Sequence, residues 1–452
     1  MGKLFGTNGV RGTINEGLTV DMILDISRAV GTVLGLGRIS ISTDSRMGGE
    51  MFKRTAISGL LSTGCDVVDI GPSPTPCLQF NTPVLHCVGG VIITASHNPP
   101  TFNGIKVIGA DGIEVTRAVE AAIEDVYFSK EFAVAKWNEI GKLYSDDGAI
   151  RRYIDAIKNH VNTAAITKRA PIVVVDGANS VGSLVTPILL RELGCKVISI
   201  NAQMDGMFPG RNPEPTPENI VDLSKTVLSV GADIGIAHDG DADRATFVDE
   251  AGNILWGDQS FAIVARFVLS KKKGSTLVTP VSSGRLIEDI VEEADAKIDW
   301  TEVGSVVVSH RVVEIDAELG GEENGGVFYP NHIAVRDGAM TAAQMVDIMV
   351  SSEAKLSELV DRLPQYNSSK TKVPVPPEKK DSLLHTLLEL TKDDPRITLD
   401  GIKLQYDEGW ILMRPSGTEP LWRCFAEARS QEKADELCAR GVNLIRTAID
   451  KT

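Results

Sequence analysis

Three aspartates separated by single small residues form the strongest chemical signal in this sequence, in the segment 239–244 (Asp-Gly-Asp-Ala-Asp-Arg). The preceding segment 232–238 is typical of a buried strand, which would present the carboxylates at its carboxyl end, where α/β proteins usually bind ligands. In an extended strand, the Cα atoms of Asp239 and Asp243 would lie roughly 13 Å apart. A shared ion therefore requires the chain to curl, and the two small residues between the acids permit this. Oxygen ligands favour a hard cation, Mg²⁺ or Ca²⁺.

Two other interpretations of this run were weighed. A solvated acidic turn is common, and a calcium-binding hand would have acids at positions 1, 3 and 5 and Glu250 at position 12. The hand requires a glycine at position 6, where this chain has Arg244. The following segment 245–249 has the character of a strand and not of a helix. The run therefore predicts a metal site formed by Asp239, Asp241 and Asp243, with an arginine beside it that could bind an anion.

A serine with proton-transfer groups close by provides the second signal. Ser96 lies in the segment 94–100 (Thr-Ala-Ser-His-Asn-Pro-Pro), directly after a short apolar strand. Alone, such a serine would be a turn former or a helix cap. His97 and Lys106 add groups that can exchange protons. The chain has no G-x-S-x-G elbow, so phosphoryl transfer is more natural than acyl transfer. A phosphorylated Ser96 would carry a charge of about −1.5 to −2, which three aspartates would tolerate only with a divalent cation between them.

Three further segments could bind phosphate or sugar hydroxyls. The segment 414–420 (Arg-Pro-Ser-Gly-Thr-Glu-Pro) combines a guanidinium with backbone N–H groups and two hydroxyls, as an anion nest does, although a Pro/Gly turn with a surface arginine would look the same. The segment 321–325 (Gly-Glu-Glu-Asn-Gly) offers carboxylates and an amide suited to hydroxyl groups, or is a plain acidic turn. Arg11, between glycines, is a candidate for a second phosphate contact, and the segment 43–46 could support the same cleft.

Composition excludes several classes of function. The 452 residues have ordinary hydrophobic (42%) and charged (24%) content, and the net charge of −15 argues against nucleic acid or an anionic membrane as the main partner. The six cysteines form no C-x-x-C pair, which indicates buried structural thiols. No signal peptide opens the chain and no run of about 18 apolar residues occurs, so a cytoplasmic protein is expected.

A weak internal repeat predicts the architecture. Strand–helix–strand patterns occur at 39–70, 172–200 and 276–300, and each is followed by a strand that ends in a polar, glycine-rich loop. After residue 363 the composition changes, and the segment 373–377 resembles a linker. We therefore expect three similar α/β domains with mixed, mostly parallel sheets and a smaller α+β C-terminal domain around a central cleft. The expected ranges are 1–150 with the serine loop, 151–252 with the aspartate loop, 253–365 with the acidic loop, and 366–452 with the arginine loop.

Taken together, the four motifs resemble the α-D-phosphohexomutases, in the order in which that family carries them and over essentially the whole chain. The resemblance implies four domains around one cleft, a phosphoserine, and one Mg²⁺. It also implies interconversion of 1-phospho and 6-phospho sugars through a hexose 1,6-bisphosphate, which acts as activator and intermediate.

The same resemblance assigns roles to individual positions. Ser96 resembles the phosphoserine, which would bind the metal together with Asp239, Asp241 and Asp243. The positions that correspond to catalytic groups are His97, Lys106, Arg244 and Arg11. The sugar hydroxyls would contact Glu322 and Asn324, and the phosphate that is not transferred would bind to Arg414, Ser416, Gly417 and Thr418.

Two departures concern the sugar. Many bacterial relatives have serine at the position of Asn324 and histidine at that of Gly326, whereas this loop looks like that of archaeal members. The segment 303–305 (Val-Gly-Ser) lacks the histidine, lysine or aspartate that often follows this glycine. The opening segment 5–12 is similar to phosphoglucosamine mutases.

The sequence therefore predicts a phosphoglucosamine mutase that interconverts glucosamine 6-phosphate and glucosamine 1-phosphate. A bifunctional phosphomannomutase/phosphoglucomutase is the close alternative, and a metal-dependent sugar phosphatase a distant one. The expected partner is a phosphorylated hexose or hexosamine; the oligomeric state, monomer or small homo-oligomer, is left open.

Overall fold

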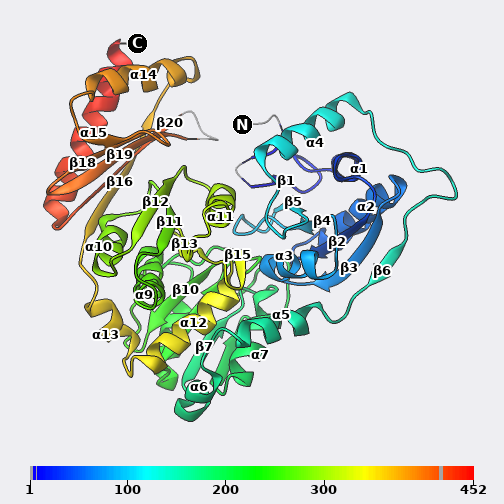
Figure 1. Ribbon diagram of the computed structural model, residues 1–452, viewed down its shortest axis with the longest axis horizontal. Coiled ribbons are helices and arrows are strands. Elements are labelled where there is room, and N and C mark those ends of the chain that lie inside the picture. Colours follow the sequence, from blue (N-terminus) through cyan, green and yellow to red (C-terminus); the bar gives the residue numbers. More distant parts are fainter. Residues whose placement is uncertain (1–3, 7, 417–420, 452) are drawn as a thin grey trace.

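The computed structural model describes residues 4–6, 8–416 and 421–451. Its strands form four separate sheets, three of which combine parallel and antiparallel pairs, while the fourth is antiparallel throughout. In Figure 1, the C-terminal domain and the N-terminal domain lie on opposite sides of the two middle domains. The expected fold class is confirmed. For description we keep the domain ranges that the sequence predicts.

Domain I contains a six-stranded sheet with the order β1-β5-β4-β2-β3-β6. Its strands are β1 (Val10–Thr13), β2 (Arg38–Thr43), β3 (Asp66–Pro72), β4 (Gly89–Ile93), β5 (Phe102–Gly109) and β6 (Leu143–Ser145). Its helices are α1 (Val20–Leu34), α2 (Gly49–Ser62), α3 (Thr75–Val84) and α4 (Arg117–Ser129). Strands β4, β2, β3 and β6 run parallel, and β5 is antiparallel to β4.

Domain II has a four-stranded sheet with the order β10-β9-β7-β8. Its strands are β7 (Ile172–Asp176), β8 (Lys196–Ile200), β9 (Ile234–His238) and β10 (Ala245–Asp249). Its helices are α5 (Ala149–Lys158), α6 (Thr163–Arg169), α7 (Gly182–Glu192) and α8 (Val221–Val230). Every residue of β9 is buried, as the apolar run before the aspartates predicts.

Domain III has a five-stranded sheet with the order β12-β11-β13-β14-β15, in which two strand pairs are parallel and two are antiparallel. Its strands are β11 (Thr276–Pro280), β12 (Lys297–Thr301), β13 (Leu319–Gly321), β14 (Val327–Tyr329) and β15 (Ile333–Arg336). Its helices are α9 (Gly257–Leu269), α10 (Arg285–Glu293), α11 (Ser305–Glu314), α12 (Gly338–Ser351) and α13 (Leu356–Asp361).

Helix α12 joins domains II and III into one core. It begins at the N-cap Asp337, whose carboxylate accepts a hydrogen bond from the backbone N–H of Met340. Nearly all of its residues are buried, and its apolar side chains belong to a cluster that includes residues of α7, α9 and β7. A helix that is apolar on every side must be buried on every side, so the neighbouring domains pack around it.

The C-terminal domain has an antiparallel sheet with the order β16-β20-β19-β18-β17. Its strands are β16 (Asn367–Pro374), β17 (Arg396–Ile397), β18 (Ile402–Tyr406), β19 (Gly409–Pro415) and β20 (Leu421–Ala428). Its helices are α14 (Lys380–Leu390) and α15 (Gln431–Lys451). The interpretation of 373–377 as a linker is wrong at its start, because Val373 and Pro374 belong to β16. A proline is tolerated there because β16 is an edge strand.

Two further expectations concern the cysteines and the membrane. All six cysteines are free and buried, as their sequence contexts indicate. Among the described residues, no helix combines the length and the apolar character that crossing a bilayer requires.

Candidate active site

The serine loop connects β4 to β5, and hydrogen bonds from one buried arginine hold its backbone in place. Arg46 donates hydrogen bonds to the carbonyl oxygens of Ser96 (2.6 Å), Asn98 (2.6 Å), Pro99 (2.8 Å) and Phe102 (3.0 Å). Because four carbonyl oxygens converge on one planar cation, the loop cannot shift without losing several charge-assisted hydrogen bonds. The predicted supporting role of the segment 43–46 thus has a geometric basis.

Ser96 itself has a backbone conformation that a serine rarely adopts. Its φ is +50°, and its N–H donates to Thr94 Oγ1 at 2.9 Å. Its hydroxyl is almost fully buried and donates to Asp239 Oδ2 at 2.9 Å. Left-handed backbone at a non-glycine residue costs roughly 1–3 kcal/mol and is concentrated at functional sites. The strain points the serine oxygen at the aspartate loop of another domain.

The aspartate loop curls at the end of β9, as a shared ion requires. The curl depends on Ala242, which has a φ of +56°, and on a hydrogen bond from the N–H of Ala242 to the carbonyl oxygen of Asp239. Gly240 is needed for another reason: a Cβ atom there would lie 2.3 Å from the carbonyl oxygen of Ser96. The missing side chain therefore allows the serine loop and the aspartate loop to touch.

The three aspartates fit a metal ion. Asp239, Asp241 and Asp243 are buried, and each can offer one oxygen such that these oxygens lie within 4.8 Å of one another. Within the described part of the chain, Oδ1 of Asp241 and Oδ1 of Asp243 are buried without a hydrogen-bond partner. Buried carboxylate oxygens without donors are costly, and a hard divalent cation would satisfy them.

The other oxygens of these carboxylates are held by protein groups. Asp241 Oδ2 accepts from Thr75 Oγ1 (2.6 Å) and from Lys106 Nζ (2.8 Å). Asp243 Oδ2 accepts from Arg336 Nη2 at 2.6 Å. Each of these two aspartates thus has one oxygen fixed by the protein and one left for a cation, which is how a preorganised metal site is built.

The charges around this cluster are strongly coupled. Burial raises the pKa of Asp243 to about 6, and the neighbouring Asp241 and Asp239 add to this effect. For Asp241, burial acts in the same direction, but the charge and hydrogen bond of Lys106 outweigh it and lower the pKa. Burial would lower the pKa of Lys106, yet the two aspartates raise it, so this lysine is charged in the structure.

His97 is the exception among the basic groups. Its Nδ1 lies 3.4 Å from Ser96 Oγ. Burial, followed by the charges of Arg244 and Arg11, lowers its pKa to about 3. The imidazole is therefore neutral near pH 7 and can accept a proton, whereas the Lys106 ammonium can only donate one.

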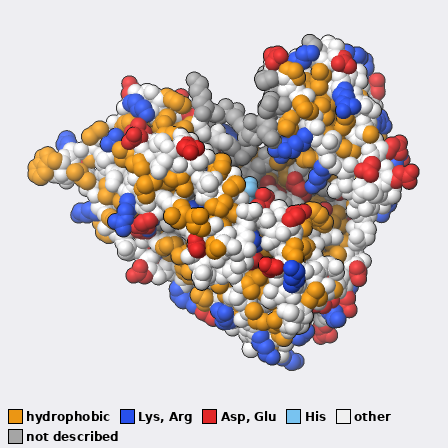
Figure 2. Space-filling view, turned by 180° about the vertical axis from the view of Figure 1, so that it is seen from behind, with side chains coloured by type: hydrophobic (Ala, Val, Ile, Leu, Met, Phe, Trp, Pro, Cys, Tyr) orange, Lys and Arg blue, Asp and Glu red, His pale blue; other side chains and the backbone are white. Residues whose placement is uncertain are grey.

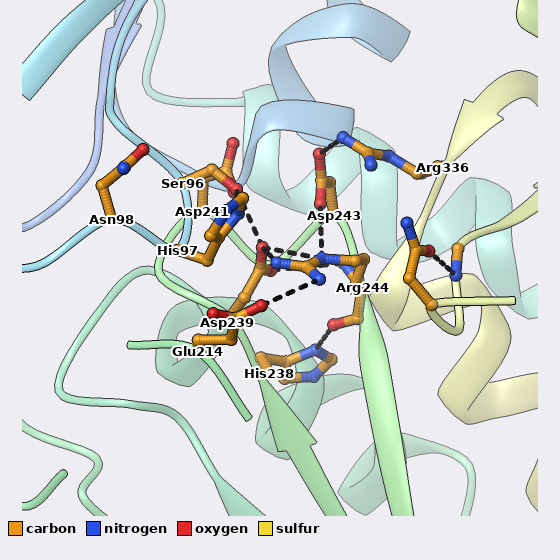
Figure 3. Close-up of polar contacts among 12 residues, drawn as sticks. Ser96, His97, Asn98, Glu214, His238, Asp239, Asp241, Asp243, Arg244 and Arg336 are labelled. Atoms are coloured by element: carbon orange, nitrogen blue, oxygen red, sulfur yellow. Dashed lines mark hydrogen bonds and ion pairs between the residues drawn. The ribbon is translucent and has the colours of Figure 1, made fainter. Parts of the chain in front are cut away.

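Two arginines contact groups next to the serine. Arg244 contacts Asp239 Oδ2 through both Nε (3.2 Å) and Nη2 (3.1 Å). Arg11 donates to Asn98 Oδ1 at 2.8 Å and to the carbonyl oxygen of Ala95 at 3.3 Å. Figure 3 shows the serine, the three aspartates and Arg244 converging from two domains, with Arg336 entering from a third. Such a concentration of cations beside a hydroxyl suits a phosphate group.

The acidic loop follows β13. Glu322 is buried, and its Oε2 accepts from Asn324 Nδ2 at 3.4 Å. The Asn324 side chain turns back to accept a hydrogen bond from the N–H of Gly326 at 3.0 Å. The loop reaches the aspartate loop through Arg336, whose Nη1 lies 3.4 Å from Glu322 Oε2. The structure thus brings Glu322 to the edge of the aspartate site.

The arginine loop is part of the C-terminal domain. Arg414 lies at the end of β19 and pairs with Asp400 through Nε (3.0 Å) and Nη2 (2.8 Å). Ser416 is buried, and its N–H donates to the carbonyl oxygen of Leu421. Gly417 and Thr418 lie outside the described residues. Figure 2 shows a hollow between this domain and domain I, with acidic and basic side chains exposed in it.

Two residues of the site were not expected from the sequence. Thr75 follows β3, and Arg336 ends β15 directly before helix α12. Like the serine and aspartate loops, both residues lie next to strand ends, and this position is the sequence signal that could have indicated them. Nothing local, however, indicates that their partners are Asp241 and Asp243.

The fold and the site together define an enzyme class built around phosphate chemistry, and comparison with known proteins identifies the family. Four family models match consecutive parts of the chain. Three describe the alpha/beta/alpha domains I, II and III of phosphoglucomutase/phosphomannomutase, at residues 2–134, 151–252 and 256–366. The fourth describes the C-terminal domain, at 371–444. The chain belongs to the phosphoglucomutase/phosphomannomutase family and is a phosphohexomutase, an enzyme of the isomerase class, as the motifs predict.

Individual relatives align with this chain over nearly the whole length of both proteins. A phosphoglucomutase/phosphomannomutase from Thermococcus kodakarensis is 49% identical over 456 residues, covering 99% of this chain and all of the relative. A phosphoglucosamine/phosphogalactosamine mutase from Sulfurisphaera tokodaii is 42% identical, covering 97% of this chain and 98% of the relative. The crystal structure of a phosphoglucomutase/phosphomannomutase family protein from Burkholderia thailandensis superposes with a TM-score of 0.89 at 27% identity, covering 98% of this chain and 97% of that one.

Proposed function

We propose that Ser96 is the phosphoryl carrier of this phosphohexomutase. The observation that carries the proposal is the contact between Ser96 Oγ and Asp239 Oδ2 at 2.9 Å, made by a serine held at a φ of +50° beside the three aspartates. A hydroxyl in a turn would not need strained backbone, a carboxylate cluster and flanking arginines at once.

The reaction would then proceed in two transfers. The bond between phosphorus and Ser96 Oγ breaks, a bond to the free C1 or C6 hydroxyl oxygen of a sugar phosphate forms, and the hydroxyl proton leaves. The resulting bisphosphate turns around and returns its other phosphoryl group to Ser96. Lys106, which is charged, is suited to protonate the departing serine oxygen, and the neutral His97 is suited to accept a proton.

We propose Mg²⁺ as the ion held by Asp239, Asp241 and Asp243, together with an oxygen of the phosphate on Ser96. The all-oxygen donor set and the two partnerless carboxylate oxygens fit a hard cation. When bound, the ion supplies positive charge that stabilises the transferring phosphoryl group. Arg244 and Arg11 would bind the phosphate oxygens that the ion leaves free.

Substrate binding would use the remaining loops. Glu322 and Asn324 are proposed to bind the sugar hydroxyls, because both lie on the loop that adjoins the aspartate site. Arg414, Ser416, Gly417 and Thr418 are proposed to bind the phosphate that is not transferred. Arg414 would have to exchange or share its partner Asp400 when a phosphate binds.

Two sugar classes are proposed as substrates. The relative with 49% identity favours glucose and mannose phosphates. The opening segment 5–12 and the relative with 42% identity favour glucosamine phosphate. Turnover of the three 1-phosphates, followed by ³¹P NMR with a trace of the matching bisphosphate, would rank them. The Asn324→Ser variant would show whether the acidic loop sets the order.

Intact-mass spectrometry tests the carrier. The purified enzyme, incubated with a hexose 1,6-bisphosphate, should gain one phosphate, and Ser96→Ala should neither gain it nor isomerise any of the sugars. Mutase activity in Ser96→Ala would overturn the proposal. Release of inorganic phosphate without isomerisation would instead show a phosphatase.

A further inference from the structure

Arg336 connects two loops that the proposed mechanism requires to act together. Its Nη2 donates to Asp243 Oδ2 at 2.6 Å, and its Nη1 lies 3.4 Å from Glu322 Oε2. One guanidinium thus touches the aspartate loop of domain II, as Figure 3 shows for Asp243, and also the acidic loop of domain III. Its side chain is 13% exposed, so both contacts are largely shielded from water.

The path of this side chain explains the glycine at position 326. A Cβ atom on Gly326 would lie 2.5 Å from Cδ of Arg336 and 3.0 Å from its Cγ. The φ of Gly326 is not in the left-handed region, so the backbone does not itself require a glycine. Any side chain at 326 and the observed position of Arg336 therefore exclude each other.

The backbone at Arg336 is held in place by buried neighbouring structure. Arg336 ends β15, and the next residue, Asp337, is the buried N-cap of α12. Asp337 Oδ1 accepts hydrogen bonds from Tyr153 Oη at 2.5 Å and from the N–H of Met340 at 2.9 Å. The long side chain thus starts from a point fixed by the shared core of domains II and III, which suits a positioning role better than a mobile surface arginine would.

We propose that Arg336 is a positioning residue for the mutase reaction, which sets the distance between the hydroxyl-binding Glu322 and the phosphoryl-transfer site at Asp243, and that Gly326 is a glycine so that Arg336 can cross it. The inference rests on the proposed function of these two loops. In binding Oδ2 of Asp243, the guanidinium leaves Oδ1, which has no hydrogen-bond partner and lies 3.8 Å from Arg244 Nε, to face the cation site. In binding Glu322, it holds that carboxylate at the edge of the site.

The variants Arg336→Met, Arg336→Ala, Arg336→Lys, Gly326→Ala and the double variant Gly326→Ala/Arg336→Ala test this role. Removal of the guanidinium should raise the KM for a hexose 1-phosphate about 10- to 100-fold, with a smaller loss of kcat. This is the range of loss that is typical when a residue hydrogen-bonded to a metal-binding side chain is replaced. Gly326→Ala should behave alike, because its Cβ displaces the arginine. Arg336→Lys should recover part of the loss, since a lysine can reach one of the two carboxylates.

The double variant decides whether the two positions act through one another. Once Arg336→Ala has vacated the space, Gly326→Ala should have no further effect on KM. Independent, multiplying losses would overturn the proposed link. Arg311→Met is the matched control, because Arg311 is a half-exposed arginine of domain III that pairs with Asp299 and Glu314 outside the site.

A binding measurement separates this inference from the proposed phosphoryl carrier. Calorimetric titration of glucose 1-phosphate and glucosamine 1-phosphate into Ser96→Ala requires no transfer step. Arg336→Met in that background should weaken the tighter of the two at least about 10-fold. Unchanged dissociation constants together with a lowered melting temperature would show a purely structural arginine and refute the inference, whether or not Ser96 carries phosphate.

Discussion

Replacing Gly240 with alanine should separate the serine loop from the aspartate loop. The new Cβ would lie 2.3 Å from the carbonyl oxygen of Ser96, whereas real Cβ contacts essentially never fall below 3.0 Å. The loops must therefore part by at least about 0.7 Å, and the obstructing atom belongs to the backbone, which cannot rotate away. A shift of this size along the contact would lengthen the 2.9 Å hydrogen bond from Ser96 to Asp239 to about 3.6 Å, beyond hydrogen-bonding range.

Misplacement of reacting groups by about 1 Å can lower an enzyme rate about 100-fold. We therefore expect kcat of Gly240→Ala to fall about 100-fold in a ³¹P NMR mutase assay, and intact-mass kinetics to show slow phosphorylation of Ser96. Because the substrate-binding loops are untouched, KM should change little. Overpacking should lower the free energy of unfolding by about 1–3 kcal/mol.

The control and the refuting result both follow from local geometry. Gly17 is exposed, and a Cβ there would have its nearest neighbour at 3.4 Å, an ordinary contact, so Gly17→Ala should leave rate and stability unchanged. A Gly240→Ala enzyme with wild-type kcat would show that the close approach of the two loops is not needed for transfer. A variant that folds and melts like the wild type would contradict the calculated clash.

Three other predictions concern the metal, the serine loop and the interface with the C-terminal domain. Removal of divalent ions by EDTA should abolish mutase turnover; Mg²⁺ should restore it and raise the melting temperature by binding the native state, and Asp243→Asn should lose that thermal shift. Arg46→Met should lower the free energy of unfolding in urea by about 3–5 kcal/mol, because it leaves the buried Asp44 without its charged partner, whereas Arg311→Met at the surface should leave this free energy nearly unchanged. Burial lowers the pKa of Lys403 to about 8, although the charges of nearby glutamates act in the opposite direction. Between pH 8 and 10.5, the unfolded chain therefore binds more protons than the folded protein does. The free energy of unfolding should therefore rise with pH in that window, by at most about 1.4 kcal/mol per pH unit for this one proton, and Lys403→Met should flatten the profile. If the slope is unchanged in the variant, other groups cause it.

The local elements around the site follow closely from the sequence. The strand expected at 245–249 has those bounds in the structure, and the strand–helix–strand patterns expected at 39–70 and 172–200 are observed as β2-α2-β3 and β7-α7-β8. These segments have clear hydrophobic periodicity and glycine or polar boundaries, which act over a few residues. Strand β16 was missed because three prolines in 373–377 suggested a linker, and only the sheet shows that this strand lies at an edge, where proline is tolerated.

The chemistry of the site is also largely present in the linear sequence. Carboxylates at 239, 241 and 243, a serine next to a histidine, and arginines between small residues limit the reactions that the chain can support. Because these groups are close to one another in sequence, their type and spacing define the donor sets directly. The resemblance that these motifs carry predicts the family and the enzyme class, and the repeated strand–helix–strand pattern predicts the fold class.

Only the tertiary structure decides how these sets meet. Ser96 and Asp239 are 143 positions apart, and Arg336 reaches Asp243 across 93. Such contacts depend on how separate domains pack, which no local pattern encodes, and the buried helix α12 is what holds Arg336 in place. Even the reason for Gly240 changed: it had been expected to permit the curl, but the curl depends on the left-handed Ala242. Gly240 provides the room for the Ser96 carbonyl, since two loops from different domains can touch only where one of them has no side chain.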